Sequence, residues 1–323
     1  MIVVDKKNIT DWVRMGTRKA FGPILKDAAD GHPELIALTA DVSNSANLGI
    51  FSNAYPKQFY NIGIAEQNMT AIACGMAKEG HNVFICSFGP FVSMRNYEAV
   101  RTLVGYMNMN VKIVAMASGM SLGVQGSTHY CLEDISLMKT IPNMMILSPS
   151  DVIEEAKCIE FLANYNGPAY LRLTGIDGTP TIFNEESLIN IKKPMLLREG
   201  QEIAIISTGS ITSECVRVAR ALKKDEIDCA LYSVCCLKPI DEIELRNILS
   251  KYKQIFVVEE HFKIGGLGDI ICDVATKNNL ICKITKIGVD DYFPHAGTYS
   301  YVLKQNKLSA PEIRDTIVSI VKN

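Results

Sequence analysis

No stretch of the 323-residue sequence reaches the roughly 18 uninterrupted apolar residues that a membrane-spanning helix needs. The apolar run at the N-terminus, "MIVV", is too short for a signal peptide. Charge of one sign is equally scarce, because the formal net charge is only −2. Membranes and nucleic acids are therefore not expected as partners, and a soluble protein is expected.

Several motifs with a known chemistry are also missing. The ten cysteines include no CxxC pair, which favours reduced thiols in a cytoplasmic protein over a disulfide framework or a zinc site. The five histidines show no spacing typical of metal ligands, and no HExxH, GxxxxGK[ST] or GxSxG motif occurs. No metal ligand is therefore predicted within this chain.

Short apolar runs rich in β-branched residues alternate with longer segments of helical period. This alternation is typical of a doubly wound, mostly parallel sheet, and it restarts after a polar, turn-rich stretch near 186–198. We therefore predict two α/β domains, residues 1–188 and 189–323. The expected strands are 34–41, 81–88, 110–118, 143–151, 168–173, 202–210, 228–239, 254–261 and 281–289, and the expected helices of the first domain lie near 11–29, 65–79, 90–107, 131–139 and 151–165.

One acidic residue raises a question about function. In "YNIGIAEQNMTAIACGMAKEG" (60–80) the spacing of apolar residues predicts a helix that begins near Glu66. A carboxylate in the first turn complements the positive end of the helix dipole and helps to cap free N–H groups. Considered by itself, Glu66 is best explained in this way.

Four collinear motifs together resemble the thiamine diphosphate enzymes of the transketolase group. These are "GIAEQNMTAIACGMA", "CSFGPFVSMRNYEAVR", "LGVQGSTHYCLEDISLMKTIPNMMILSPSD" and "VVEEHFKIGGLGD". The resemblance covers nearly the whole chain, which is similar to the C-terminal half of a transketolase: a pyrimidine-binding domain followed by the C-terminal domain. It implies an enzyme that transfers a two-carbon ketol unit from a ketose to an aldose.

The resemblance gives Glu66 a catalytic role. In the family, a glutamate at this position hydrogen-bonds a ring nitrogen of the cofactor's aminopyrimidine and favours the imino tautomer, which takes the proton from the thiazolium carbon. Phe88 and Phe91 resemble the aromatic residues that pack against this ring, although phenylalanines at this spacing are usually ordinary core residues. Met94 stands where many transketolases have a tyrosine. The resemblance also assigns Asp41 to the cofactor-binding set.

The same resemblance identifies residues for the sugar. His129, in "QGSTH", would lie near the donor carbonyl and stabilise negative charge or pass a proton. Gln125 replaces an aspartate that contacts the donor's hydroxyl in typical transketolases, and Ala117 replaces a phosphate-handling histidine, so an altered sugar substrate is expected. The positions that match sugar-phosphate ligands of the family are Arg18, Ser45 and Arg172, for each of which a surface ion pair or a cap is the alternative.

The family binds the cofactor diphosphate and Mg²⁺ through a GDG…N motif on a separate domain, and this chain contains no GDG. The resemblance therefore implies half a thiamine site and an obligate alpha partner, in an α2β2 assembly. Two related alternatives stay open at this point: the beta subunit of a 2-oxo acid dehydrogenase decarboxylating component, and a deoxyxylulose phosphate synthase-like enzyme. A third alternative is a non-catalytic α/β binding or regulatory subunit.

Overall fold

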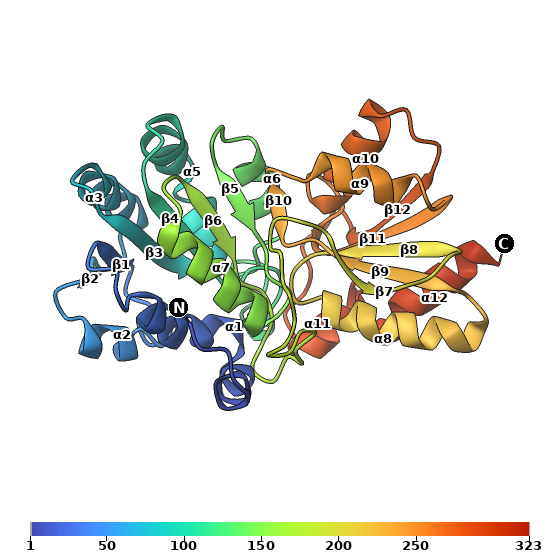
Figure 1. Cartoon of the computed structure of the whole chain (residues 1–323), viewed down its shortest axis with the longest axis horizontal. Coiled ribbons are helices and arrows are strands. Elements are labelled where there is room, and N and C mark those ends of the chain that lie inside the picture. The colour runs from blue at the N-terminus through green and yellow to red at the C-terminus, as the bar shows by residue number, and fades with distance from the viewer. Residues whose placement is uncertain (1, 323) are drawn as a thin grey trace.

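Two β-sheets organise the chain in the computed structural model, which describes residues 2–322 (Figure 1). The strand order is β10-β5-β6-β4-β3-β1-β2 in the first sheet and β12-β11-β8-β9-β7 in the second. Neighbouring strands are parallel except at one edge of each sheet, where β10 pairs with β5 and β7 pairs with β9. The predicted fold class, two mostly parallel α/β domains, is confirmed.

The first sheet carries the thiamine-related motifs. Its strands β1, β3, β4 and β6 are buried along most of their length, as expected for a parallel sheet covered by helices on both faces. The elements of this part of the chain are α1 (Lys6–Ala28), β1 (Leu35–Thr39), α2 (Gly49–Ala54), β2 (Phe59–Asn61), α3 (Glu66–Lys78), β3 (Asn82–Phe88), α4 (Gly89–Ser93), α5 (Tyr97–Ala99), the π-helix Val100–Tyr106, β4 (Val111–Met116), the 3₁₀ turn Gly123–Gln125, α6 (Asp134–Lys139), β5 (Met145–Leu147), α7 (Val152–Asn164) and β6 (Ala169–Arg172).

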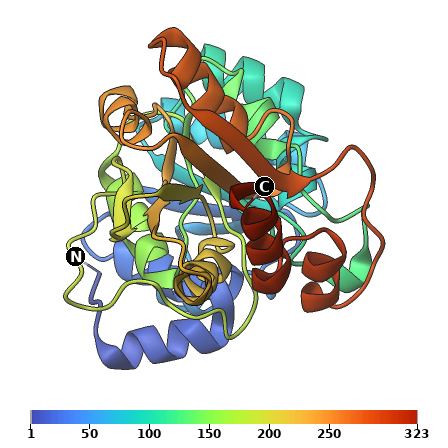
Figure 2. The same ribbon diagram turned by 90° about the vertical axis from the view of Figure 1, so that its right-hand side faces the viewer.

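The second sheet has helices on both sides, and Figure 2 shows it in front of the first domain. Its elements are β7 (Met195–Arg198), β8 (Ile203–Ser207), α8 (Thr212–Leu222), the 3₁₀ turn Lys223–Asp225, β9 (Cys229–Ser233), β10 (Cys236–Lys238), α9 (Glu242–Leu249), β11 (Gln254–Phe262), α10 (Leu267–Lys277), β12 (Lys283–Val289), α11 (Tyr299–Gln305) and α12 (Ala310–Val321). The predicted boundary near 186–198 overlaps the irregular segment between β6 and β7 and the strand β7 itself. The exact division at 188/189 stays a prediction.

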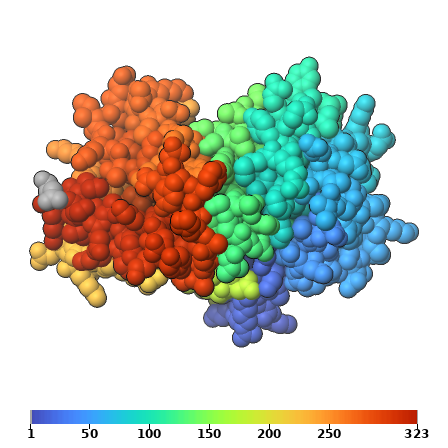
Figure 3. All heavy atoms as spheres, turned by 180° about the vertical axis from the view of Figure 1, so that it is seen from behind, coloured from blue at the N-terminus to red at the C-terminus, as the bar shows by residue number. Residues whose placement is uncertain are grey.

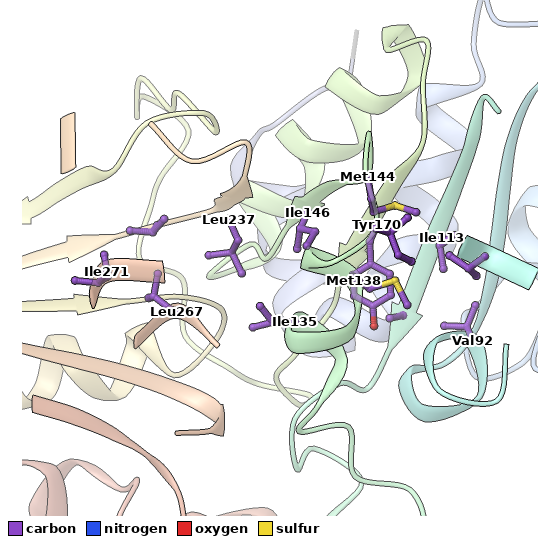
Figure 4. Packing of buried hydrophobic residues seen from close by; sticks show 14 of the residues in the cluster. Val92, Ile113, Ile135, Met138, Met144, Ile146, Tyr170, Leu237, Leu267 and Ile271 are labelled. Carbon is purple, nitrogen blue, oxygen red and sulfur yellow. The ribbon is translucent and has the colours of Figure 1, made fainter. Parts of the chain in front are cut away.

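The two domains share one hydrophobic core. The predicted strand 228–239 is in fact two strands: β9 stays in the second sheet, whereas β10 joins the edge of the first. Leu237 of β10 thereby packs among residues of both domains, and Figure 4 shows Ile135 and Met138 of α6 between this strand and the first sheet. Contacts of this kind fix one domain against the other.

Candidate active site

Glu66 lies at the start of α3, next to the edge of the first sheet. Strand β2 ends at Asn61, and Gly63 turns the chain with a φ of +80°, a conformation that glycine adopts at little cost. The Glu66 side chain is only 3% exposed. Its Oε1 accepts a hydrogen bond from Ser87 Oγ at 3.4 Å, and its Oε2 lies 3.3 Å from Arg95 Nη1. The carboxylate is therefore directed at side chains beyond its own helix, which is more than a helix-capping role requires.

The aromatic residues predicted for the cofactor ring lie together at the end of β3. The Phe88 and Phe91 rings meet edge to face, with centroids 6.3 Å apart. The His129 ring contacts Phe91 in the same manner at 5.4 Å. The structure thus places Phe88, Phe91 and His129 in one group, which Arg95 joins to Glu66.

Arg95 belongs to this group but was not predicted. Its guanidinium carbon lies 4.3 Å above the centre of the Phe91 ring, a cation–π contact, while the same group bonds to Glu66. The available sequence signal was its spacing, because Arg95 follows Phe91 by four residues and so occupies the same side of a helical turn. A half-exposed arginine therefore covers both the carboxylate and the aromatic face.

Met94 and Asp41 stand at the border of this group. Met94 ends α4 and is half-buried. Asp41 follows β1 in the left-handed region, with a φ of 58°, and exchanges hydrogen bonds with Asn61 at 3.0 and 3.1 Å. Asp41 thus ties the end of β1 to the end of β2, at the carboxyl edge where open parallel sheets bind ligands.

The predicted sugar-binding residues are only partly brought together. Gln125 is exposed and shares the loop 119–131 with His129, whose Nδ1 lies 3.0 Å from Thr128 Oγ1. Arg18 and Ser45 are half-buried, in α1 and in the turn that follows β1. Ala117, at the end of β4, is buried in the left-handed region with a φ of 52°.

Arg172 lies in the interior, and its predicted contact with a substrate phosphate requires correction. It is completely buried, and its Nε donates to Asp134 at 2.9 Å. Its Nη2 donates to the carbonyl oxygens of Cys131 and Glu260 at 3.2 and 2.9 Å. Since Asp134 already balances its charge and solvent does not reach it, Arg172 joins the two domains instead of binding sugar phosphate.

Other titratable groups near this ion pair are also buried. Burial raises the pKa of Glu259 to about 7, although the N–H groups of Leu267 and Gly268 stabilise its anion at 2.7 and 2.8 Å. Burial lowers the pKa of His261 to about 4, so this imidazole is neutral at physiological pH. Both side chains belong to the packing between the domains.

The donor groups at Glu66 fit the pyrimidine end of thiamine diphosphate. A buried carboxylate beside aromatic rings can share a proton with a ring nitrogen while the rings pack against a heteroaromatic face. A divalent metal has no comparable site, because residues 2–322 contain no group of three or more His, Cys, Asp or Glu side chains able to hold one. The chain thus fits one end of the cofactor only.

Comparison with known families agrees with this geometry. The model of the transketolase pyrimidine-binding domain matches residues 14–177, and that of the transketolase C-terminal domain matches residues 192–313. The chain belongs to the transketolase family. It spans almost the whole length of relatives that are themselves single subunits or sections.

Three similar proteins describe the neighbourhood of this transketolase-family chain. A Methanocaldococcus jannaschii protein described as "Putative transketolase C-terminal section" is 37% identical, with 96% of this chain and 98% of the relative covered. A subunit of the apulose-4-phosphate transketolase of Phocaeicola vulgatus is 30% identical, with 94% and 97% covered. A solved structure described as "Split gene transketolase, inactive beta4 tetramer" is 30% identical, with a TM-score of 0.84 and 93% and 96% covered.

Proposed function

We propose that this chain is the C-terminal subunit of a split, thiamine diphosphate-dependent transketolase. The observation that carries the proposal is the buried Glu66 carboxylate beside the Phe88 and Phe91 rings, within a domain of the pyrimidine-binding family. The relative named as a transketolase subunit supports the same conclusion. The reaction would move a two-carbon ketol unit from a ketose to an aldose.

Three kinds of side chain would divide the work. Thiamine diphosphate, when bound, supplies the electron sink for carbon–carbon cleavage. Glu66 would share a proton with a pyrimidine nitrogen, and Phe88 and Phe91 would hold the ring in place. His129, in contact with Phe91, would donate a hydrogen bond to the donor carbonyl oxygen and stabilise the negative charge that develops there.

A partner subunit would complete the site. The described residues offer no metal cluster for the Mg²⁺ that would accompany the diphosphate, so we assign both to an alpha subunit. Ile64 and Tyr60, beside Glu66, are 76% and 42% exposed and give the partner an apolar contact. The related structure named as an inactive beta4 tetramer supports a requirement for alpha, and we propose an α2β2 enzyme.

The sugar would differ from the usual pentose phosphates. Gln125 is exposed on the His129 loop, and Ala117 presents only a methyl group where a histidine would handle phosphate. Arg18 and Ser45 keep the role of phosphate ligands in this proposal. One relative is named for apulose-4-phosphate, which makes less common ketose phosphates the first donors to test. A cytoplasmic location is proposed with it, in keeping with ten free cysteines.

The proposal is tested by a ketol-transfer assay with thiamine diphosphate and Mg²⁺. The chain alone, a transketolase N-terminal-half subunit alone and the mixture are compared with a panel of ketose donors and aldose acceptors. Transfer is expected in the mixture only. Release of carbon dioxide from a 2-oxo acid without any ketol transfer would instead assign the protein to the decarboxylating relatives.

A further inference from the structure

The loop that carries His129 is closed at its base but has little packing of its own. Gly119 and Cys131 form an antiparallel bridge with two hydrogen bonds of 2.9 Å, so residues 119–131 leave and re-enter the first domain at one point. Between these ends Gly126 has a φ of +74°, and Val124 is 74% exposed. A glycine-containing loop of this kind has many accessible conformations unless other groups restrain it.

The second domain supplies those restraints. Ser127 Oγ donates to the Pro294 carbonyl at 2.6 Å, and Tyr130 Oη lies 3.2 Å from the His295 carbonyl oxygen. The Gly297 N–H donates to the Gly123 carbonyl at 3.0 Å. Side chains and backbone of the loop are thus bonded to residues 294–297, and Figure 3 shows the orange-red surface of the second domain against the green surface of the first.

The approach of the two segments is too close for larger residues. A Cβ atom on Gly123 would lie 2.4 Å from the Gly297 carbonyl oxygen, and one on Gly126 would lie 3.2 Å from the Ala296 Cβ. The loop therefore fits the 294–297 segment along its length, in addition to its hydrogen bonds.

The base of the loop is restrained by the same domain. The buried Glu260 carboxylate accepts from the Met120 N–H with one oxygen and from Tyr299 Oη, at 2.7 Å, with the other. Arg172 bonds the carbonyl oxygens of Cys131 and Glu260, so it holds the far end of the loop against β11. The loop is thus anchored at its start, its middle and its end.

We propose that residues 294–299 and Glu260 of the second domain position the His129 loop for catalysis. This gives the second domain a part in the chemistry, with Ser127, Tyr130 and Tyr299 as positioning residues. The proposal rests on the proposed function for its kinetic part, since a small displacement of a catalytic group has a large effect on rate. The anchoring itself is a property of the free chain.

The test uses the double variant Ser127→Ala/Tyr130→Phe, which removes two hydroxyl groups that bond to carbonyl oxygens across the domain boundary. The matched control is Ser250→Ala/Tyr252→Phe, which removes hydroxyl bonds to the Asn247 and Gly200 carbonyls at 3.0 and 3.1 Å, within the second domain. Hydrogen exchange of the free chains is measured first. We expect exchange in 119–131 to become at least about tenfold faster in the test variant only, with core strand β3 unchanged.

The kinetic measurement uses each variant mixed with the partner subunit. The ratio kcat/KM for the sugar should fall about 10- to 100-fold in the test variant, with the half-saturating thiamine diphosphate concentration unchanged. In a His129→Ala background the same double substitution should have no further effect, because it acts through His129. Unchanged exchange in 119–131, or full additivity with His129→Ala, would overturn the positioning role. An inactive wild-type mixture would refute the proposed function alone, because the exchange experiment still decides the anchoring.

Discussion

At the scale of single residues, Glu66 combines a buried carboxylate with only weak structural partners. We expect Glu66→Gln to lower ketol transfer in the reconstituted mixture by at least about 100-fold, because an amide cannot share a proton with a pyrimidine nitrogen in the same way. The free energy of unfolding should change by no more than about 1 kcal/mol, since Arg95 is half-exposed and such ion pairs contribute little. The exposed Glu79, at the end of the same helix, provides the control Glu79→Gln. Full activity of the Glu66 variant would show that the carboxylate is only a helix-dipole partner.

Arg172 allows a prediction that separates a structural role from substrate binding. Replacing it with methionine leaves Asp134 buried without its partner, so we expect the free energy of unfolding to fall by about 3–5 kcal/mol in urea titrations. The double variant Arg172→Met/Asp134→Leu should recover much of this loss, because no unpaired charge is left. A single variant with wild-type stability and only a raised KM for the sugar would restore the phosphate-binding role.

At the scale of elements, α7 contains a buried acid that its surroundings do not satisfy. Both carboxylate oxygens of Glu155 are buried without a hydrogen-bond partner among the described residues. Burial, reinforced by the nearby negative charge of Asp151, raises its pKa well above the usual 4.5. The folded chain therefore keeps this proton at pH values where the unfolded chain has lost it. Stability from this group is complete below about pH 4.5 and is lost as the pH rises toward the raised folded-state pKa.

Glu155→Met should accordingly stabilise the chain at pH 8 by about 1–3 kcal/mol, because it removes a buried polar group without partners. Between pH 5 and 8, the decline in urea midpoint should become shallower than in the wild type. Glu160, further along α7, is half-buried and pairs with Lys157, so Glu160→Gln should leave the slope unchanged. An equal slope for the wild type and Glu155→Met would mean that water reaches this carboxylate.

The sequence pattern predicted the elements best where periodicity alone decides them. Helices α3 and α7 and strands β3, β4 and β11 lie within a few residues of the expected ranges, because apolar spacing reports burial directly. The expected helix 90–107 is divided into α4, α5 and a π-helix, and the pattern cannot reveal such a change of winding. The division of 228–239 between two sheets was missed for a similar reason, because it depends on contacts with distant β5.

At the scale of the whole molecule, the candidate site was predictable only where motifs carry it. The resemblance placed Glu66, Phe88, Phe91 and His129 in one site, and the structure brings them together. It could not show that Arg172 is consumed by an ion pair with Asp134, nor that Arg95 reaches Glu66, because both depend on side-chain packing between distant segments. The anchoring of the His129 loop by residues 294–299 was equally beyond sequence patterns, since much of it uses backbone atoms.

Assembly provides the last prediction, because half a site is silent without its other half. Ile64 is 76% exposed two residues before Glu66, so an alpha subunit that covers Glu66 should also cover this side chain. We expect Ile64→Asp to weaken association with alpha by about 10- to 100-fold in analytical ultracentrifugation, because a carboxylate loses its hydration in the interface. Transfer activity should recover at high alpha concentration, since the catalytic groups are intact.

Leu188, which is 93% exposed in the segment between the domains, provides the matched control Leu188→Asp. The two substitutions introduce the same charge at similarly exposed aliphatic positions, so solubility effects should be alike in both. Loss of association with both variants would point to a general effect of charge, and normal association of Ile64→Asp would place the partner on another face. Weaker association confined to Ile64→Asp would locate the alpha subunit over Glu66, where the missing half of the thiamine site has to stand.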